Sequence, residues 1–225
     1  MQPQNFDAYA PSYDNHFTNS LIGKEQRLQV HQKLLNKISF INKSVLEINC
    51  GTGEDALWLS KQSAAVIATD ISQGMINVAK NKLTNSSIDF KTLAAQNISS
   101  LSPNKFQVIF SNFGGLNCLN NHEFQKFKAG CEQLQKSCDQ LAFVIMGTKC
   151  KWEQLYFSFK KDKAKATRRQ VKAGVETIIN DNHFKTYYYS PAEMNTFQEY
   201  TGAGTKQRAT HFDNIPKGLR NNFYI

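Results

Sequence analysis

A glycine-containing turn is the part of this sequence whose residue types are best suited to bind a ligand. The turn, Asn49-Cys50-Gly51-Thr52-Gly53, follows the β-like segment 44–48 and precedes Glu54 and Asp55, which are typical of a first helical turn. A strand that ends in such a turn and opens a helix presents backbone N–H groups and the positive end of the helix dipole. Glycine also allows ligand atoms to approach the chain closely. The turn therefore predicts a site for an anionic or polar ligand.

Two carboxylates accompany this turn. The spacing Gly51-x-Gly53-x-x-Ala56, with Asp70 seventeen residues after Gly53, fits the dinucleotide fingerprint and its downstream ribose-binding acid. An ionised carboxylate only accepts hydrogen bonds, so Asp70 is suited to two ribose hydroxyls. By itself this match leaves an NAD(P)-dependent oxidoreductase open. The position of Glu47 inside the strand, and a helical segment over 1–42 before it, point away from a nicotinamide enzyme.

Alternating apolar and helical segments must position these groups. The sequence predicts strands at 44–48, 64–69, 88–93, 106–111 and 141–147, and helices at 54–59, 72–82 and 121–138. Strands that alternate with helices imply βαβ units. We therefore expect an α/β, Rossmann-like, mostly parallel sheet with helices on both faces.

The two ends of the chain follow different patterns. Residues 1–42 are predicted to form a helical cap from leucines and other apolar residues at helix-like spacing: Leu21, Leu28, Val30, Leu34, Leu35 and Ile38. After Gly147 we expect a basic helix over 150–170, a hairpin of strands 175–179 and 184–189 turning at 180–183, and a helix from Ser190-Pro191. That last helix carries Met194, Phe197 and Tyr200 and stops near Gly202. We interpret the chain as one domain with a cap (1–42), a core (43–148), an inserted α/β lid (149–190) and a C-terminal helix and tail (191–225), whose final antiparallel strand is hard to find before Ile225.

The segment Val45–Gly53 resembles the first motif of the class I S-adenosylmethionine-dependent methyltransferases, in their small-molecule, type 11-like group. Asn49 departs from the motif, because it stands where the first glycine usually is. Asn tolerates a positive φ better than other non-glycine residues, so the turn is compatible with it. The segment 70–75 is similar to the family's Asp-x-Ser-x-x-Met, and 106–116 to its fourth strand and following loop.

This resemblance implies a cofactor, S-adenosylmethionine, and a set of residues that bind it. Asp70 would accept both ribose hydroxyls and Met75 would pack on adenine; Gln96-Asn97-Ile98 would read the adenine edge. Tyr13 and Arg27 of the cap signature would cover or pair with the methionine carboxylate. The complete predicted set is Tyr13, Arg27, Glu47, Asn49, Gly51, Gly53, Asp70, Ile71, Met75, Gln96, Asn97, Ile98, Asn112 and Phe113. Simpler roles remain open for several of them: helix capping for Asp70, core packing for Met75, and ordinary surface positions for Tyr13 and Arg27.

No catalytic residue and no metal site is assigned. Histidine side chains commonly serve as general bases, so His122 is a candidate base, but its surroundings, Asn120-Asn121-His122-Glu123, are those of a polar helix start. Methyl transfer from a sulfonium depends mainly on in-line positioning of the nucleophile. The loop 112–115 lacks both the Pro-Pro motif of enzymes that methylate base amino groups and the Pro-Cys nucleophile of those that methylate cytosine carbon. We therefore expect a small-molecule acceptor, disfavour nucleic-acid bases, and leave tRNA or protein acceptors open.

Composition limits the remaining classes. Hydrophobic residues make up 40% of the 225 residues and charged residues 20%, which is enough apolar surface for a buried core. The first residues show no signal-peptide pattern and the strongest apolar run, 141–146, is too short to cross a bilayer, so a cytoplasmic protein is expected. The five cysteines form no C-x-x-C pair and are interpreted as reduced thiols.

A basic segment, residues 149–172, carries much of the formal charge of +9, because it holds nine basic residues and only two acidic ones. Its apolar residues, Trp152, Leu155, Tyr156 and Phe159, are spaced to share one helical face, which predicts a lid over the acceptor site. Core packing with a solvated basic face is the simpler alternative. A third possibility is a non-catalytic nucleotide- or RNA-binding module that uses this segment for contact.

Overall fold

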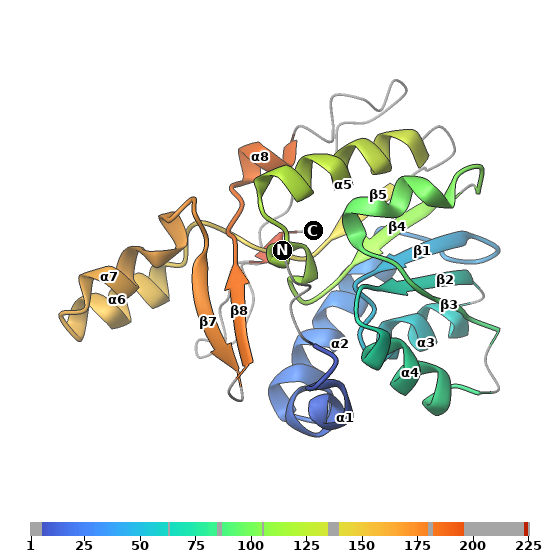
Figure 1. Ribbon diagram of the computed structural model, residues 1–225, viewed down its shortest axis with the longest axis horizontal. Helices are drawn as coiled ribbons and strands as arrows, with labels where there is room; N and C mark the ends of the chain where they lie inside the picture. The colour runs from blue at the N-terminus through green and yellow to red at the C-terminus, as the bar shows by residue number, and fades with distance from the viewer. Residues whose placement is uncertain are drawn as a thin grey trace.

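The protein was analysed as a computed structural model, in which residues 6–62, 64–84, 87–104, 106–134, 140–179, 182–195 and 223–224 are described. Five parallel strands form the central sheet in the order β3-β2-β1-β4-β5. Their bounds are β1 (Ser44–Ile48), β2 (Ala65–Asp70), β3 (Asp89–Thr92), β4 (Val108–Ser111) and β5 (Gln140–Phe143). The predicted parallel α/β sheet is confirmed (Figure 1).

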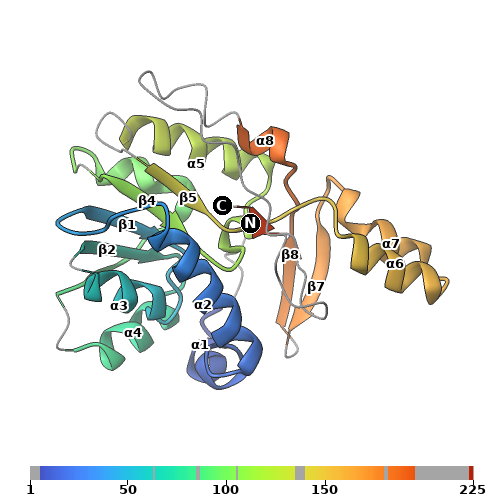
Figure 2. The ribbon, with the colours of Figure 1, turned by 180° about the vertical axis from the view of Figure 1, so that it is seen from behind.

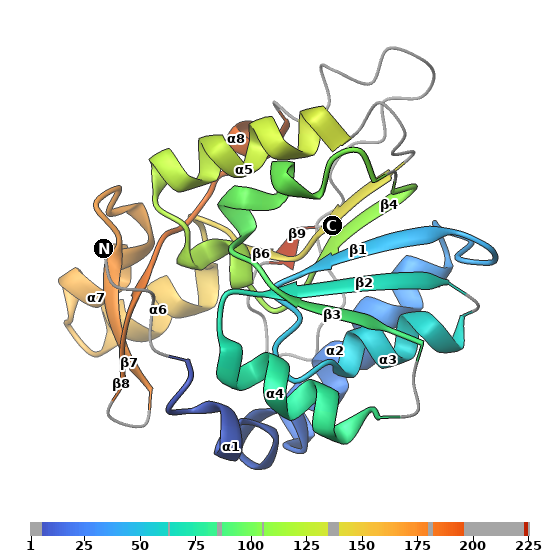
Figure 3. The same cartoon turned by 45° about the vertical axis from the view of Figure 1, so that its right-hand side comes forward.

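Helices cover both faces of this sheet, as Figure 3 shows. On one face lie α2 (Leu21–Leu35), α3 (Glu54–Lys61) and α4 (Gln73–Lys82), which share a core cluster with Val45 and Phe110. On the other face the 3-10 segment η2 (Ala95–Leu101) and α5 (Asn121–Leu134) pack around Leu46, Ile48 and Phe127. Because strand side chains alternate between faces, Glu47 shares the α2–α4 face with Val45.

The N-terminal cap consists of α1 (Ala10–Tyr13), a π-helical turn (Asp14–Thr18) and α2. Only some of the apolar residues predicted for this helix face the core. Val30 and Leu34 are buried, and so is Ile38 just beyond the helix, whereas Leu28 and Leu35 are each 50% exposed. Residues seven apart share one line along a helix, so Leu21, Leu28 and Leu35 form an outer stripe, while Val30 and Leu34 belong to the core cluster under the sheet.

The chain after β5 leaves the sheet. Its elements are β6 (Ile145–Met146), α6 (Lys151–Phe159), α7 (Lys163–Thr167), a 3-10 turn (Arg168–Gln170), β7 (Val175–Ile179), β8 (Asn182–Thr186), α8 (Pro191–Asn195) and β9 (Phe223–Tyr224). A short 3-10 turn, η3 (Gly115–Cys118), follows β4. Strands β7 and β8 pair as the predicted antiparallel hairpin. The hairpin stands between the sheet and the α6–α7 pair, which projects from the body of the molecule (Figures 1 and 2).

Several boundaries differ from the expectations. The predicted helix 150–170 is two helices, because Lys161 adopts a positive φ of 57° between them. The apolar segment 141–147 divides into β5 and β6, and β6 pairs antiparallel with β9, which supplies the final strand that the sequence did not reveal. Ser190 and Glu193 form the predicted capping box of α8. The expected positions of Phe197, Tyr200 and Gly202, and residues 135–138 of the helix after β4, lie outside the described residues.

Candidate functional site

The candidate site lies at the carboxyl ends of β1, β2 and β4, where the strand order reverses between β1 and β4. Open α/β sheets bind ligands at this switch point. The turn after β1 has three residues with positive φ, which are Asn49 (58°), Gly51 (53°) and Gly53 (83°). A Cβ on Gly53 would lie 3.0 Å from the ring of Phe90, so glycine also lets the turn approach the neighbouring core.

Asp70 joins this turn to the end of β2. Its carboxylate accepts a hydrogen bond from the backbone N–H of Gly51 at 2.9 Å and another from that of Ser72 at 2.9 Å. The side chain is nearly buried, and burial raises the pKa of Asp70. The N-cap of α4 is Ser72, whose hydroxyl accepts from the backbone N–H of Met75, so Asp70 supports the helix start only through its bond from the backbone N–H of Ser72. Its carboxylate has lone pairs left for hydroxyl donors, and ribose binding by Asp70 stays a prediction.

Glu47 is the unsatisfied group of this site. It is 2% exposed, and its Oε2 atom has no hydrogen-bond partner among the described residues. Burial, followed by the nearby negative charge of Asp55, raises the pKa of Glu47 well above its ordinary value. A buried carboxylate oxygen without a partner is costly, so this position is suited to a cationic or hydrogen-donating ligand group.

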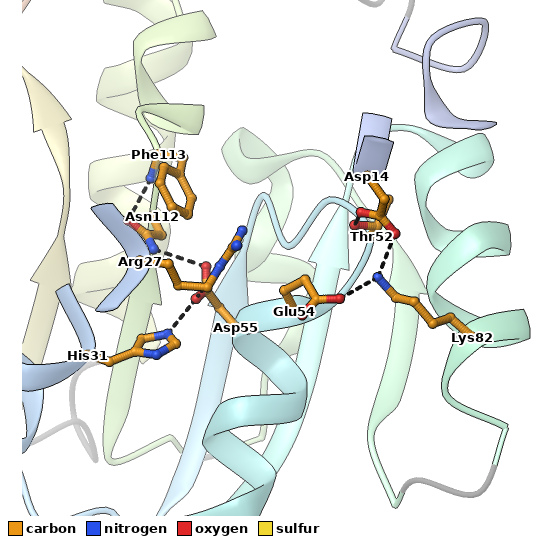
Figure 4. Close-up of polar contacts among 9 residues, drawn as sticks. All are labelled: Asp14, Arg27, His31, Thr52, Glu54, Asp55, Lys82, Asn112 and Phe113. Atoms are coloured by element: carbon orange, nitrogen blue, oxygen red, sulfur yellow. Dashed lines mark hydrogen bonds and ion pairs between the residues drawn. The ribbon is translucent and has the colours of Figure 1, made fainter. Parts of the chain in front are cut away.

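Asp55 organises a cluster that the sequence did not single out (Figure 4). Its carboxylate accepts hydrogen bonds from Nε of Arg27 at 3.2 Å, from Nε2 of His31 at 2.7 Å and from Nδ2 of Asn112 at 3.0 Å. Burial acts to raise the pKa of Asp55, but the bond from His31 and the charge of Arg27 outweigh it, and the net pKa is lowered. The cluster thus ties α2, α3 and the end of β4 together. His31 also stacks on Trp58, with ring centroids 3.8 Å apart.

Two aspartates of the N-terminal cap form hydrogen bonds with the carboxyl-end edge of the sheet. Asp7 accepts hydrogen bonds from the hydroxyl of Ser72 and from the backbone N–H of Gly74 at 2.7 Å. Asp14 accepts from the hydroxyl of Thr52 and from Nζ of Lys82 at 2.8 Å (Figure 4). The cap therefore contacts both the turn after β1 and the start of α4.

The side chain at the unusual motif position, Asn49, is accommodated by the loop after β4. A Cβ added to Gly115 would lie only 2.4 Å from Cβ of Asn49, and the hydroxyl of Ser111 is 3.5 Å from its Oδ1. Asn49 therefore occupies space that a side chain at 115 would need. Asn49 thus stands where the motif usually has glycine, and the residue that faces its side chain, Gly115, is itself a glycine.

Tyr13 and Arg27 both lie at the site rather than on the outer surface. An ideal Cβ on Gly51 would be 4.0 Å from the ring of Tyr13, and burial raises the pKa of that phenol. The guanidinium of Arg27 lies over the ring of Phe113, 4.7 Å from its centroid, and also binds Asp55. Phe113 has a positive φ of 52°, and its ring meets Phe17 of the cap edge-on.

The remaining predicted residues are distributed between site and core. Asn112 is buried and accepts a bond from the backbone N–H of Phe113 in addition to its contact with Asp55. Met75 is 2% exposed in α4, and Ile71, just before α4, is half-buried. In the short helix η2, Gln96 is half-buried, Asn97 is exposed and Ile98 is fully buried among the residues under α5. Ligand contact by these six residues stays a prediction.

His122 is exposed at the start of α5, where Asn120 and Glu123 exchange capping hydrogen bonds. This is the polar helix start that the sequence offered as the simpler interpretation. Among the described residues, no group of three or more His, Cys, Asp or Glu side chains is arranged to hold a metal ion.

Comparison with known proteins agrees with this fold. Residues 45–137, less than half of the chain, match the protein family described as a methyltransferase domain. The resemblance and the Rossmann-like fold predicted from the sequence are therefore confirmed.

Two curated relatives share about half of this chain. A malonyl-[acyl-carrier protein] O-methyltransferase of Priestia megaterium is 36% identical over 114 residues, which is 48% of this chain and 38% of that protein. A demethylmenaquinone methyltransferase of Bacteroides fragilis is 33% identical over 119 residues, which is 49% and 47%. The chain thus spans less than half the length of these two relatives.

Solved structures extend the likeness in fold to nearly the whole chain. A DhpI complex with SAM and HEP has a TM-score of 0.62 at 18% identity, covering 97% of this chain and 91% of that one. The magnesium protoporphyrin IX methyltransferase of Synechocystis, solved with bound SAH, has a TM-score of 0.62 at 14% identity, covering 97% and 94%. At these identities the likeness establishes the fold.

Some residues of this region were given no site role by the sequence analysis, although two of them, Asp7 and Asp14, fall within the cap signature. They are Asp7, Asp14, His31, Asp55 and Asn117, of which the last is buried and hydrogen-bonds the backbones of Met146 and Tyr187. Asp55 carried a weak signal as an acidic residue in a first helical turn. Their partners lie far away along the chain, so spacing alone gives no further indication.

Proposed function

We propose that this protein is an S-adenosylmethionine-dependent methyltransferase that acts on a small-molecule acceptor and releases S-adenosylhomocysteine. The observation that carries the proposal is the set of acidic groups on a methyltransferase domain: Asp70 beside the Gly51 turn, and the unsatisfied Glu47 one strand away. A nucleoside that bears an amino-acid cation fits both. Asp70 accepts ribose hydroxyls, and Glu47 compensates the ammonium group of the methionine end.

The chain's own residues would do the positioning. When bound, S-adenosylmethionine supplies an electrophilic methyl group on a sulfonium. Tyr13, Arg27 and Phe113 lie on the cap side of the turn and restrict access of water to that end of the site. Asp55 orients Arg27 and Asn112 through direct hydrogen bonds, so we treat it as a positioning residue. Catalysis then depends on alignment of the acceptor with the methyl group, and no general base is assigned.

Support for a small-molecule acceptor comes from the relatives, because the two curated proteins are named for small or carrier-bound acceptors. None of the described helices is long and apolar enough to cross a bilayer. A cytoplasmic location, exclusion of nucleic acid as substrate, and a lid role for 149–190 stay predictions.

Calorimetry tests the cofactor. We expect S-adenosylhomocysteine to bind and NADH and NADPH not to bind. Asp70→Ala should weaken S-adenosylhomocysteine about 30- to 1000-fold, because a charged acceptor of two hydrogen bonds is lost, worth about 2–4 kcal/mol. Asp89→Ala, at an exposed position of β3, is the control and should bind as the parent does. Binding of a nicotinamide cofactor alone would replace the proposal with an oxidoreductase, and binding of the nucleoside without methyl transfer to any metabolite pool would favour a binding module.

A further inference from the structure

The outer face of α6 is apolar and exposed. Trp152 is 46% exposed, Leu155 64%, Tyr156 58% and Phe159 88%. At about 100° per residue, these four positions fall within one stripe of the helix. The core-packing alternative drawn from the sequence is therefore wrong for this stripe. We refer to these four residues as the α6 apolar face.

The inner side of α6, which carries the half-buried residues Glu153, Gln154 and Phe157, is fixed against the following turns. Glu153 binds Nε of Arg168 at 2.9 Å and the guanidinium of Arg169 at 2.8 Å. Partial burial acts to raise the pKa of Glu153, but these two hydrogen bonds outweigh it and lower the pKa to about 2. The carboxylate is thus ionised at neutral pH. Arg168 and Lys165 also lie over the ring of Phe157.

Arg169 anchors this arrangement to the rest of the molecule. Its side chain is 6% exposed overall, donates to the carbonyl of Gly147 at 3.3 Å and lies over the ring of Tyr188. Rotation of α6 about its axis would bury the apolar face only by exposing Glu153 and separating it from both arginines. The ion pairs therefore hold the apolar face outward.

Lysines border the α6 apolar face. On a helical projection, Lys151 lies at one border of the stripe and Lys160 at the other, and Lys161 and Lys163 follow at the end of the helix. All four are exposed. The two arginines of the segment face inward to Glu153, so the outward charge around the stripe comes from lysine.

This pattern distinguishes the possible occupants. A second copy of the chain would bring one lysine border against another, which is repulsive. A nucleic-acid duplex is bound mainly by cations on its phosphates, whereas the centre of this surface carries the uncharged Tyr156 and Phe159. The candidate site, at the carboxyl ends of β1, β2 and β4, lies on the other side of the β7–β8 hairpin from α6 (Figures 1 and 2).

We propose that the α6 apolar face docks on an anionic lipid bilayer surface. Trp and Tyr favour the interfacial region, Leu and Phe gain by entering the acyl boundary, and lysines at the borders attract acidic headgroups. A helix with this composition lies in the plane of the interface without crossing it. The proposal concerns binding alone, so it stands or falls independently of methyl transfer.

The test uses the full chain with vesicles of phosphatidylcholine alone and of phosphatidylcholine mixed with phosphatidylglycerol. We expect sedimentation with the mixed vesicles only, and a blue shift of Trp152 fluorescence, which brominated lipids quench. Phe159→Ser should weaken partitioning about tenfold, because an apolar side chain no longer enters the membrane. Leu21→Ser is the matched control, since Leu21 is also 88% exposed but lies on α2. Its partitioning should be unchanged.

Charge provides a second, independent arm. The double variant Lys160→Gln/Lys163→Gln should weaken binding to the acidic vesicles about 25-fold, at about fivefold for each lysine near the surface. Lys24→Gln/Lys80→Gln removes two exposed charges elsewhere and should have little effect. Rising salt should reproduce the loss.

Three outcomes would overturn the proposal. The first is no difference between neutral and acidic vesicles, and the second is an equal loss for Leu21→Ser and Phe159→Ser. The third is the absence of vesicle binding. In that case, self-association that Phe159→Ser abolishes, seen by ultracentrifugation, would favour a second copy of the chain as the occupant. Salt-dependent binding of RNA would favour a nucleic acid. A protein that binds vesicles but does not bind S-adenosylhomocysteine would leave this proposal standing and refute the proposed function.

Discussion

Asp55 and Glu153 are both ionised acids that bind arginine, yet they organise opposite kinds of region. Asp55 is buried, and its three partners are distant along the chain. His31 and Arg27 of α2 are 24 and 28 positions away, and Asn112 at the end of β4 is 57 positions away. Glu153 binds arginines only 15 and 16 positions away, within the segment that projects from the hairpin. The first acid assembles an edge from distant elements, whereas the second fixes a local pair of helices and leaves an apolar surface outside.

Each acid matters for the groups that it holds in place. At Asp55, the groups held are Arg27 and Asn112, beside the turn that is proposed to bind the cofactor. At Glu153, the element held is α6, with Phe159 facing solvent. The loss of either acid should therefore be felt in different measurements.

The largest effect is expected from Asp55→Ala. The variant leaves Arg27, His31 and Asn112 without their shared acceptor in a buried position, which costs about 3–5 kcal/mol of unfolding free energy. Urea denaturation followed by circular dichroism measures this loss. Glu54→Ala, which removes the neighbouring, more exposed acid and its ion pair with Lys82, is the control and should cost less than about 1 kcal/mol. Equal losses for the two variants would mean that the Asp55 cluster is not a special feature of this edge.

The next effect tests whether Asn49 and Gly115 form a complementary pair. Gly115→Ala should destabilise the protein by about 1–3 kcal/mol, because its new Cβ would meet Cβ of Asn49 at 2.4 Å. Asn49→Gly in the same chain should restore most of the loss, since glycine adopts the positive φ of this position and vacates the space. Urea midpoints of the parent, both single variants and the double variant give the coupling energy. Additive losses would show that the two positions do not compensate for each other.

A smaller effect of opposite sign is expected at Glu47. Because burial raises its pKa in the folded state, the folded protein binds a proton more readily than the unfolded chain, and stability falls as pH rises through the unfolded carboxyl range. Glu47→Gln should therefore stabilise the ligand-free protein at pH 7 by on the order of 1 kcal/mol. The gain should vanish as the pH falls below the ordinary glutamate value of about 4.3. Thermal unfolding at several pH values measures it, and a gain that is independent of pH would contradict the assignment.

The same Glu47→Gln variant should bind S-adenosylhomocysteine more weakly than the parent, because the amide no longer compensates the ammonium group. Improved stability together with unchanged affinity would mean that the unsatisfied Oε2 atom of Glu47 does not serve the cofactor.

The smallest effect is expected in the projecting arm. Phe159→Ser should change the unfolding free energy by less than about 0.5 kcal/mol, because the side chain is 88% exposed. The same urea titration as for Asp55→Ala measures it. A loss above about 1 kcal/mol would show that the α6 apolar face packs against the protein, and the contrast between the two regions would disappear.

The sequence by itself determined the parallel sheet, because alternating apolar strands and helices leave few other arrangements. It also determined the position of the turn at Gly51 and Gly53 and its partner Asp70, because the motif spacing and backbone chemistry are local to two βα units. The resemblance to methyltransferases followed from the same short segments. These were the parts of the molecule in which neighbours along the chain are neighbours in space.

Tertiary structure decided the rest. Periodicity predicted a helical cap over residues 1–42, but it did not show that Val30 and Leu34, rather than Leu28 and Leu35, are buried. Asp7 and Asp14 of the N-terminal cap bind groups more than thirty positions away, and no spacing rule connects such pairs. An apolar stripe on a basic helix indicated a buried face, yet Glu153 and its arginines hold that stripe outward. The physical reason is that the orientation of an amphipathic helix depends on which face gains the more favourable contacts, and the partners for those contacts are supplied by the fold.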